Sequence, residues 1–506
     1  MKSRTLRILL VVLLAAVSLV IIPQIGSRDS GKTGEELART HCGSCHGFTE
    51  PGLLDKKTWT EGVLPEMGLR MGIGDRNVVL NRMSFQLFDK LCNIGVYPDK
   101  PVISAKEWKR IVAYYEKNAP EKLTDSTSSF SYSAVDTPFV IRTLPVSGQG
   151  QITLSRFMPD RREIWVCSRS NEWHTFAPDG SLKSNVRVGG TVVDVLEGKD
   201  PMLLSIGNML PNEDRNGRLL QKSSNGNRYE ILLDSLHRPV QFLRTDMDGD
   251  GIEDWLVAEF GFETGRLRWF DGKDKTPRLL TEKPGARSLI PLDADADGDT
   301  DILALFAQAR EEVVLFRNEG SGTFKPVSLL SFPPIYGSSS LEWADMNNDG
   351  HGDLVIAYGD NADYSIVPKP YHGIRIFLND GRFSFRQSAF LPVNGATKVL
   401  ARDFDLDGDN DMAMIAFFAI EKDKRSFLYF ENDGKGGFHA SNIGVPAGHW
   451  LVMDAQDMDA DGDEDIVLGN FLMAEDPNEK KGSETVKSVL LENRTSSNGT
   501  ARGALK

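Results

Sequence analysis

A short aspartate-rich segment that recurs five times constrains the fold of this chain more than any other feature. Its copies begin at Asp246, Asp293, Asp345, Asp403 and Asp457, at intervals of 47 to 58 residues. Each copy is followed by an apolar stretch such as WLVAEFG and then by a second stretch such as LRWFDG, and both compositions favour strands. A repeat of this length built from short strands is typical of a β-propeller, in which each repeat supplies one four-stranded blade.

Two weaker copies precede the five complete ones and set the expected number of blades. Residues 156–169 and 192–207 keep the apolar strand but have lost the aspartates. The last copy ends after its second clear strand, at Leu491, so we expect a strand near 139–144 to complete that sheet and leave no open edge. The sequence therefore predicts an all-β propeller of seven blades over residues 139–497, with six or eight blades as alternatives.

The five acidic segments, here called loops 1 to 5 in chain order, have the pattern of a calcium site. They read DMDGDGIED, DADADGDTD, DMNNDGHGD, DFDLDGDND and DMDADGDED. Positions 1, 3, 5 and 9 carry a side-chain oxygen, and the glycine at position 6 permits a sharp turn. Many oxygen ligands at this spacing favour Ca²⁺ over Mg²⁺, with up to five ions bound. The predicted ligands are Asp246, Asp248, Asp250, Asp254, Asp293, Asp295, Asp297, Asp301, Asp345, Asn347, Asp349, Asp353, Asp403, Asp405, Asp407, Asp411, Asp457, Asp459, Asp461 and Asp465.

Two other interpretations of the loops fit their sequences less well. An EF-hand needs a glutamate at position 12 and a following helix, whereas a strand pattern follows here. Plain Asp-Gly turns are the second alternative, but without a cation each loop would crowd several carboxylates of like charge. We therefore expect calcium, with loop 3 the least typical because Asn347 replaces an aspartate.

The acidity of the chain follows from these loops. Its formal net charge is −14, and five bound Ca²⁺ ions would raise that charge to −4. The excess negative charge is thus mostly a property of the predicted metal sites. A chain of this charge is not expected to bind nucleic acid.

The loops resemble the FG-GAP or VCBS repeats of the propellers of integrin α-subunits and of many exported bacterial proteins. The resemblance rests on the loop positions quoted above. It departs from the FG-GAP name because no Gly-Ala-Pro follows Phe260-Gly261, and the first two blades lack the loop. The resemblance implies a propeller with calcium at its blades, but the fold hosts many roles and implies no single activity.

A second motif, Cys42-Gly43-Ser44-Cys45-His46, is the pattern of covalent haem c attachment. Two thiols three positions apart reach the two vinyl groups of one macrocycle, and the adjacent His46 faces the iron as an axial ligand. A zinc half-site would need a second pair of ligands, and a redox-active cysteine pair does not need the histidine. We therefore predict one covalently bound haem.

The segment around this motif, residues 30–123, resembles the class I cytochrome c fold. Thr33 with Glu36, and Ser104 with Glu107, form the capping-box pattern that begins a helix. The first of these helices would lead into the haem motif, and the second has an apolar face. The whole chain is thus predicted to be multidomain, with a small all-α cytochrome c domain followed by the propeller.

In that family the sixth ligand of the haem iron is usually a downstream methionine. The candidates here are Met67, which we favour, then Met71 and Met83. A thioether is a weak ligand that raises the haem potential relative to a second histidine. His41 lies beside the attachment site and is treated as non-ligating.

The chain begins with an export pattern. Lys2, Arg4 and Arg7 precede an apolar run over 8–22, so residues 1–26 are predicted to be a cleaved signal peptide or a retained membrane anchor. The expected location is the periplasm, or the outer face of the cytoplasmic membrane, of a bacterium. A Ser/Thr-rich linker is predicted at 124–138, and a disordered tail at 498–506.

The remaining cysteines and histidines give weaker signals. Cys92 and Cys167 are either a disulfide or, as we favour, two free thiols. Four histidines in loops of the propeller sequence could face one end of its channel, although an ordinary packing or surface position is favoured for each. They are His237, His372, His439 and His449.

Three functions are consistent with these features. The first is an electron carrier whose propeller docks a redox partner, another protein or a polysaccharide. The second is a redox enzyme whose propeller oxidises a sugar or alcohol and passes electrons to the haem, although the sequence has no dinucleotide fingerprint. The third is an adhesion or envelope protein that uses the haem as a redox sensor. The first hypothesis is preferred, and no catalytic residue is assigned.

Overall fold

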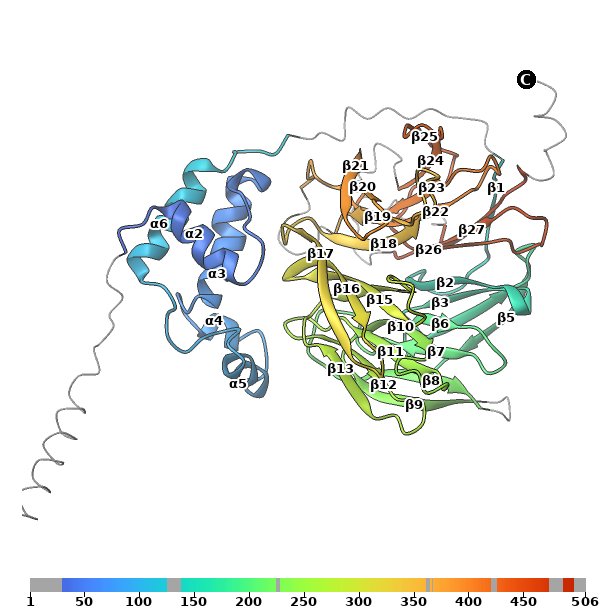
Figure 1. Cartoon of the computed structure of the whole chain (residues 1–506), viewed down its shortest axis with the longest axis horizontal. Coiled ribbons are helices and arrows are strands. Elements are labelled where there is room, and N and C mark those ends of the chain that lie inside the picture. The colour runs from blue at the N-terminus through green and yellow to red at the C-terminus, as the bar shows by residue number, and fades with distance from the viewer. Residues whose placement is uncertain are drawn as a thin grey trace, which may run out of the picture. The chain divides into compact units, whose positions relative to one another are not determined.

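A computed structural model of the chain describes residues 30–124, 138–223, 228–360, 365, 367–419, 426–472 and 486–495. The chain divides into two compact units. The first holds the described residues of 30–41 together with 59–118, and the second holds 42–58 with the described residues from 119 onward. Residues 30–124 are coloured blue to cyan and residues 138–495 teal to red in Figure 1, and each unit is described by itself below.

Short helices make up the first unit and the segment next to it. The helices of the unit are α2 (Gly34–His41), η3 (Thr58–Val63), α3 (Leu64–Arg70), α4 (Asn77–Leu80), α5 (Phe85–Asn93) and α6 (Ala105–Asn118). The turns η1 (Cys42–Ser44) and η2 (Pro51–Leu53) follow α2. In the part of the chain that the structure describes, no helix is both long and apolar enough to cross a membrane. The predicted leader lies outside that part.

Both predicted capping boxes are present. The Thr33 backbone N–H donates to the Glu36 carboxylate at 2.8 Å, and the Glu36 N–H donates back to the Thr33 hydroxyl at 3.2 Å. Ser104 and Glu107 make the same exchange at the start of α6. The helix α2 packs against α6 closely enough that a Cβ on Gly34 would collide with the α6 backbone. Local hydrogen bonds thus define where these helices begin.

The second unit is a β-propeller. Its described strands form seven four-stranded antiparallel sheets, which confirms the predicted number of blades. Two sheets correspond to the weaker repeats: β2 (Ile152–Met158), β3 (Glu163–Ser168), β4 (Glu172–Phe176), β5 (Leu182–Arg187), and β6 (Val192–Leu196), β7 (Met202–Ser205), β8 (Gly217–Lys222), β9 (Tyr229–Leu236). A short helix, η5 (Pro159–Arg161), joins β2 to β3.

The other five sheets each contain one acidic loop. Two are β10 (Pro239–Thr245), β11 (Asp254–Glu259), β12 (Arg266–Phe270), β13 (Pro277–Thr281), and β14 (Ala286–Leu292), β15 (Asp301–Gln308), β16 (Arg310–Asn318), β17 (Phe324–Phe332). Two more are β18 (Ser338–Ala344), β19 (Asp353–Tyr358), β20 (Gly373–Asn379), β21 (Phe385–Pro392), and β22 (Ala396–Arg402), β23 (Asp411–Ala416), β24 (Phe427–Asn432), β25 (Phe438–Ser441). The last is β26 (Trp450–Gln456), β27 (Asp465–Asn470), β28 (Ser488–Glu492) with β1 (Val140–Thr143).

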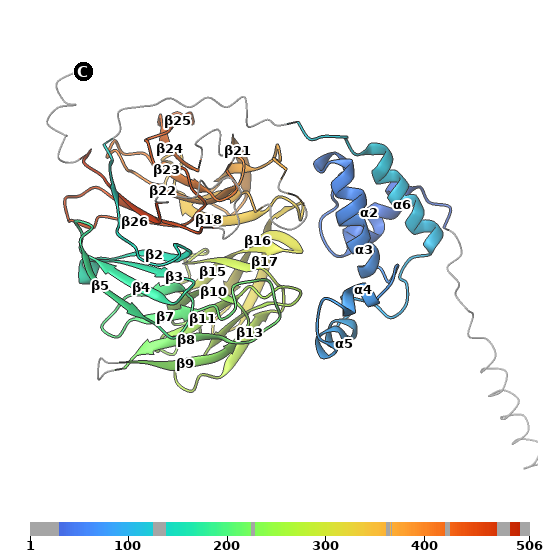
Figure 2. The same ribbon diagram turned by 180° about the vertical axis from the view of Figure 1, so that it is seen from behind.

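The last blade is completed by the first strand of the propeller, as the sequence predicts. β1 pairs antiparallel with β28, so that Val140 lies opposite Glu492 and Thr143 opposite Val489. β26, from the end of the propeller, lies beside β2, from its start, in both views (Figures 1 and 2). The ring of blades is therefore closed, and neither end blade leaves its sheet one strand short.

Hydrophobic packing between neighbouring blades forms the core. The second strands of the blades are the most deeply buried; β11, β19 and β23, for example, contain only buried residues. Cys167 lies in one of these interfaces, against Trp165 and Leu203, and burial raises the pKa of its thiol. Cys92 and Cys167 are both free thiols, which agrees with the favoured prediction.

A β-bulge occurs near the start of the innermost strand of every blade. The pairing register between the first and second strands shifts at the same place in all seven described sheets. Because a bulge breaks the alternation of side chains, two consecutive residues of a strand can face the same side. In six blades such a pair lines the central channel, as Arg287 and Ser288 do in β14 and Thr397 and Lys398 in β22.

Polar side chains in this channel join several inner strands to their neighbours. The Asp194 carboxylate of β6 accepts the backbone N–H of Phe242 in β10 at 3.1 Å. The Gln241 side chain of β10 accepts the N–H of Leu289 in β14 at 2.7 Å, and the Ser340 hydroxyl of β18 accepts that of Val399 in β22 at 3.1 Å. A side chain that satisfies a backbone N–H of the neighbouring blade fixes the angular position of the two blades.

We predict that closure of the ring depends on Phe139, which precedes β1. Its ring lies edge-on to Phe404 and Tyr429 at centroid distances of 5.9 and 5.8 Å, and it is 8% exposed. Phe139→Ala should lower the free energy of unfolding by about 3 kcal/mol, because a buried aromatic side chain is lost. The matched control is Arg142→Ala, on the same strand, whose exposed ion pair with Glu492 contributes about 1 kcal/mol or less. Equal losses for the two variants in urea unfolding would contradict this role.

A second prediction concerns Glu311 at the start of β16. This carboxylate is 2% exposed and accepts the N–H groups of Gly337 and Ser338, yet burial raises its pKa to about 7. The unfolded chain ionises this group near pH 4.5 and the folded chain near 7, so the folded state binds more protons in between. Stability should therefore fall as the pH rises from about 4.5 to about 7, by up to about 3 kcal/mol.

Glu311→Gln should flatten that part of the stability–pH curve. The measurement is urea unfolding of both proteins across this pH range. An unchanged slope in the variant would show that another group causes the dependence.

Candidate functional site

The acidic loops occupy equivalent places in five consecutive blades. Each connects the first strand of a blade to its second, as loop 1 connects β10 to β11 and loop 5 connects β26 to β27. Because first strands of all blades run the same way along the channel, these five connections lie at the same end of the propeller. The sequence repeat thus becomes a ring of acidic loops on one face.

Positions 1, 3 and 5 converge in four of the loops. One carboxylate oxygen from each of these aspartates lies within 4.8 Å of the others in loops 1, 2, 4 and 5. Ca²⁺ binds oxygens at about 2.3–2.6 Å, so two oxygens on one ion lie at most about 5 Å apart. The four triplets therefore fit a calcium ion in size and in ligand type. They are Asp246, Asp248 and Asp250; Asp293, Asp295 and Asp297; Asp403, Asp405 and Asp407; Asp457, Asp459 and Asp461.

Loop 3 differs because Asn347 holds position 3. The Asn347 amide donates to the Asp349 carboxylate at 2.9 Å, and this hydrogen bond lowers the pKa of Asp349. Position 3 of this loop thus supplies a neutral oxygen rather than a charged one. A site of this composition is expected to bind calcium more weakly than its neighbours.

The backbone of each loop is held by its own carboxylates. In loop 2 the Asp293 side chain accepts the N–H groups of Asp297 and Gly298 at 3.2 and 3.1 Å, and Asp297 accepts that of Asp299 at 2.9 Å. The glycine at position 6 has φ +91° in this loop, in agreement with the sharp turn predicted for it. Local hydrogen bonds from side chains to the backbone therefore shape the loop.

Position 4 of each loop also has an unfavourable backbone conformation, which the sequence did not reveal. Position 4 also has positive φ in every loop, although it is glycine only in loop 1. Ala296, Leu406 and Ala460 adopt φ of +59°, +59° and +68°. This left-handed conformation costs about 1 kcal/mol or more in residues with a side chain, and such strain is concentrated at functional sites.

Position 9 is placed differently from positions 1, 3 and 5. Asp301 of loop 2 is 0% exposed, and its two oxygens accept the N–H groups of Ala294 and Asn318 at 2.8 and 2.6 Å. Asp254, Asp353 and Asp465 also accept one amide of their own loop and one from the end of the third strand or just beyond it. In loop 4, Asp411 accepts from Asn432 N–H and from the Tyr429 hydroxyl. The position-9 carboxylate therefore joins the loop to the third strand of its blade.

An asparagine near the end of the third strand extends this connection to the neighbouring blade. The Asn318 side chain donates to the carbonyl of Thr300 in its own loop and to that of Met247 in loop 1, at 3.3 and 3.1 Å. Asn432 and Asn493 likewise donate to a carbonyl of the preceding loop. The sequence repeats Asn-Asp-Gly or Asn-Glu-Gly at the end of several third strands. This repeat was the signal that could have revealed the connection between blades.

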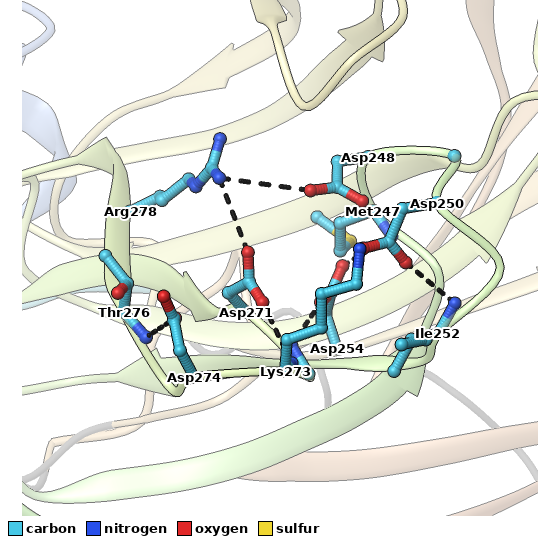
Figure 3. A network of polar contacts seen from close by, with 12 residues as sticks. Met247, Asp248, Asp250, Ile252, Asp254, Asp271, Lys273, Asp274, Thr276 and Arg278 are labelled. Atoms are coloured by element: carbon cyan, nitrogen blue, oxygen red, sulfur yellow. Dashed lines mark hydrogen bonds and ion pairs between the residues drawn. The ribbon is translucent and has the colours of Figure 1, made fainter.

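Two cations from the β12–β13 hairpin lie beside loop 1, as Figure 3 shows. Lys273 lies 2.5 Å from Asp250 and lowers the pKa of that carboxyl, and Arg278 lies 3.9 Å from Asp248. In loop 4, by contrast, burial and the charge of Asp407 raise the pKa of Asp405 to about 6. An ion bound in loop 1 would therefore compete with protein cations, whereas one bound in loop 4 would relieve crowding of carboxylates.

The haem-type motif lies in a tight turn after α2. Cys42 begins the turn η1, and the backbone N–H groups of Cys45 and His46 both point to its carbonyl. The His46 Nδ1 donates to the Gly47 carbonyl at 2.8 Å, so a neutral imidazole carries its lone pair on Nε2. Two free thiols on one turn and an imidazole oriented by a backbone carbonyl are a donor set that fits haem c.

The candidate methionines all belong to the helical unit. Met67 lies half-buried in α3, and Met71 is the residue that ends that helix. Met83 packs against the apolar cluster of Leu69, Val79, Leu91 and Tyr97. The choice among the three as iron ligand is still a prediction, with Met67 favoured.

The four propeller histidines do not form one exposed group at an end of the channel. His237 and His372 are 0% exposed, whereas His439 is exposed on β25. His449 is half-buried and donates through Nδ1 to the Phe417 carbonyl at 2.8 Å. Their positions agree with packing or surface roles rather than with a shared catalytic centre.

Comparison with known proteins supports the repeat assignment. Residues 246–304 and 293–356 match the FG-GAP-like repeat family, and these stretches cover loops 1, 2 and 3 and the strands from β11 to most of β19. The chain thus contains FG-GAP repeats within a seven-bladed β-propeller, which confirms that part of the resemblance seen in the sequence. No curated protein matched the sequence.

Three solved structures to which the chain is similar are distant from it in sequence. The WD40 domain of Neurospora crassa Pan2 is 12% identical, with a TM-score of 0.45, over 71% of this chain and 96% of that one. BBS1N in complex with ARL6DN is 7% identical in its mercury-soaked crystal and 8% in its lead-soaked crystal, each with a TM-score of 0.42 and covering 71% of this chain and 97% of that one.

We predict that positions 5 and 9 of a loop have separable roles, which loop 2 can test. Asp301→Ala should lower the free energy of unfolding by about 2 kcal/mol or more even with a chelator present, because two backbone N–H groups lose their acceptor. Asp297→Ala should change stability little in chelator but remove part of the stabilisation that added calcium provides. Urea unfolding with and without calcium measures both effects, and the same pattern for the two variants would contradict the distinction.

Proposed function

We propose that this chain is an exported mono-haem c-type cytochrome that carries electrons, with a calcium-stabilised propeller as its binding scaffold. The observation that carries the proposal is the turn Cys42–Ser44 together with Cys45 and His46, which places two free thiols next to an imidazole. This Cys-x-x-Cys-His sequence directly follows a capped helix, and it is the attachment pattern of haem c. The export pattern at 1–26 and a location in the periplasm or on the outer face of the membrane belong to the same proposal.

In this proposal Cys42 and Cys45 form the thioether bonds and His46 is an axial ligand of the iron. Met67 is the favoured sixth ligand, with Met71 and Met83 as alternatives. The haem, when bound, supplies reversible one-electron transfer. The protein contributes by orienting the imidazole: the Gly47 carbonyl accepts the Nδ1 proton and so keeps Nε2 available in the neutral tautomer.

The proposed role of calcium is structural. Ions in the acidic loops would neutralise carboxylates that crowd one end of the propeller, and four of the loops have oxygens at distances that suit one ion. Since Asn318 and its equivalents connect neighbouring loops, order in one loop stabilises the next. A rigid ring of this kind suits a scaffold that binds a redox partner, another protein or a polysaccharide.

We predict that Cys45→Ala and His46→Ala each abolish the normal haem spectrum when the protein is produced in a host that attaches haem c. Cys45→Ala should lose one of the two thioether bonds, which shifts the α-band of the pyridine haemochrome, and His46→Ala should lose the proximal nitrogen. Cys92→Ser is the matched control because that thiol lies outside the motif, and it should keep the spectrum of the parent. Equal haem content and identical spectra in all four proteins would overturn the proposal.

A substrate test then separates the carrier from the enzyme. The ferric protein is mixed with calcium and a panel of sugars, alcohols and polysaccharides, with no other reductant. Reduction of the haem by a member of this panel would favour a redox enzyme and identify its substrate class. Reduction by dithionite and by a small cytochrome, but by none of the panel, is the outcome expected for an electron carrier.

A further inference from the structure

The axis of the propeller contains a cavity that the proposed electron transfer does not use. It has a volume of about 880 Å³ and is lined by the inner strands and by the loops at their starting ends. Cavities of this size hold small ligands in other proteins. The bulges described above direct two consecutive side chains of most inner strands into it, which is a use that β-bulges commonly serve near binding sites.

The lining of this channel is rich in charge but differs in sign from the protein as a whole. Among the described residues it carries six Lys or Arg side chains and five Asp or Glu side chains. One of those acids is Glu311, whose pKa burial raises to about 7. The channel is therefore net positive in a chain whose formal net charge is −14.

Two of the cations are neutralised by the protein. Arg156 contacts Asp194 and Asp454 at 2.9 and 3.3 Å. Arg402 contacts Glu342 at 3.0 Å and also lies 3.4 Å from Glu464. These ion pairs join inner strands of different blades, so their role is accounted for by the fold.

Three other cations have no such partner in the described part of the chain. Arg238 donates only to the carbonyls of Met209 and Gly261, and Arg287 donates only to the carbonyl of Ser339. Lys398 makes neither a hydrogen bond nor an ion pair with any described residue, and burial lowers its pKa. Carboxylates act on these cations without forming an ion pair: Glu213 acts on Arg238 and Asp360 on Arg287. Asp454, Glu342 and Asp194 act in the same way on Lys398. A cation that lacks a direct ion pair in a partly desolvated channel contributes little to stability, so its position there calls for another role.

We propose that this channel is a binding site for a small organic acid with two or more carboxylates, held by Arg287 and Lys398. The two cations come from β14 and β22, with the blade of β18 between them, so one ligand must present acidic groups in two directions. A guanidinium binds a carboxylate through two parallel N–H groups, whereas an ammonium acts as a point charge. Arg238, just before β10, adds positive charge beside the same cavity.

The three cations proposed to hold the ligand all lie in the propeller, outside the haem-type motif, although Leu54 from the segment after that motif also lines the cavity. The test is titration of the intact protein with succinate by calorimetry, at constant calcium, with glucose and inorganic phosphate as other probes. Succinate should bind saturably at one site, and Arg287→Met and Lys398→Met should each weaken binding about tenfold or more. The exposed Lys325 on β17 provides the matched control, and Lys325→Met should leave the affinity unchanged.

A stability measurement distinguishes loss of the site from loss of the fold. Lys398→Met should unfold at a higher urea concentration than the parent in the absence of ligand, because a desolvated charge is replaced by an apolar side chain of similar length. Weaker binding by a more stable variant supports the proposal. Absence of saturable succinate binding, equal affinity in Lys325→Met and Lys398→Met, or binding of phosphate or glucose as tight as that of succinate would overturn it.

Discussion

The pairing of β1 with β28 is the contact on which the rest of the propeller depends. A stack of blades buries each sheet between two neighbours, so an open stack would expose the faces of its first and last blades. By supplying β1 from the start of the sequence to the last sheet, the chain joins these two ends covalently and by hydrogen bonds. The ion pairs of Arg156 with Asp194 and Asp454 lie at the same junction and connect the first blade to both of its neighbours. The ring of loops and the channel exist only because this junction closes.

Within each acidic loop the aspartates divide into two groups with different physical tasks. Positions 1, 3 and 5 lie near the surface, and their oxygens converge on a point that suits a cation. Position 9 is buried, and its oxygens satisfy backbone N–H groups of the loop and of the third strand. The asparagine that follows the third strand then reaches the preceding loop. The loop is thus both a candidate metal site and a structural connection between blades, which explains why an ion bound there would stabilise more than its own turn.

Much of the architecture was predictable because its signals are local. The acidic loops, the strands beside them and the two capping boxes depend on residues close together in the sequence, and the structure contains each of them. Even the closing strand near 139–144 could be predicted, since the last repeat lacked a strand. The hydrogen bonds of position 9 could not, because the fold alone brings the third strand beside the loop. The Asp301 carboxylate accepts the N–H of Ala294 from its own loop and that of Asn318 from the third strand.

The sequence by itself determined the kind of fold, its number of repeats and the chemistry of its two motifs, a set of carboxylate oxygens and a pair of thiols beside a histidine. Tertiary structure decided which charges meet. Arg156 and Asp454 are almost three hundred residues apart yet form an ion pair. Arg287 and Lys398 line the same channel, but neither makes an ion pair with a described residue. Such distinctions depend on the angular order of the blades and on the bulge in each inner strand. Both arise from hydrogen bonds between segments far apart in the chain, and no local pattern encodes them.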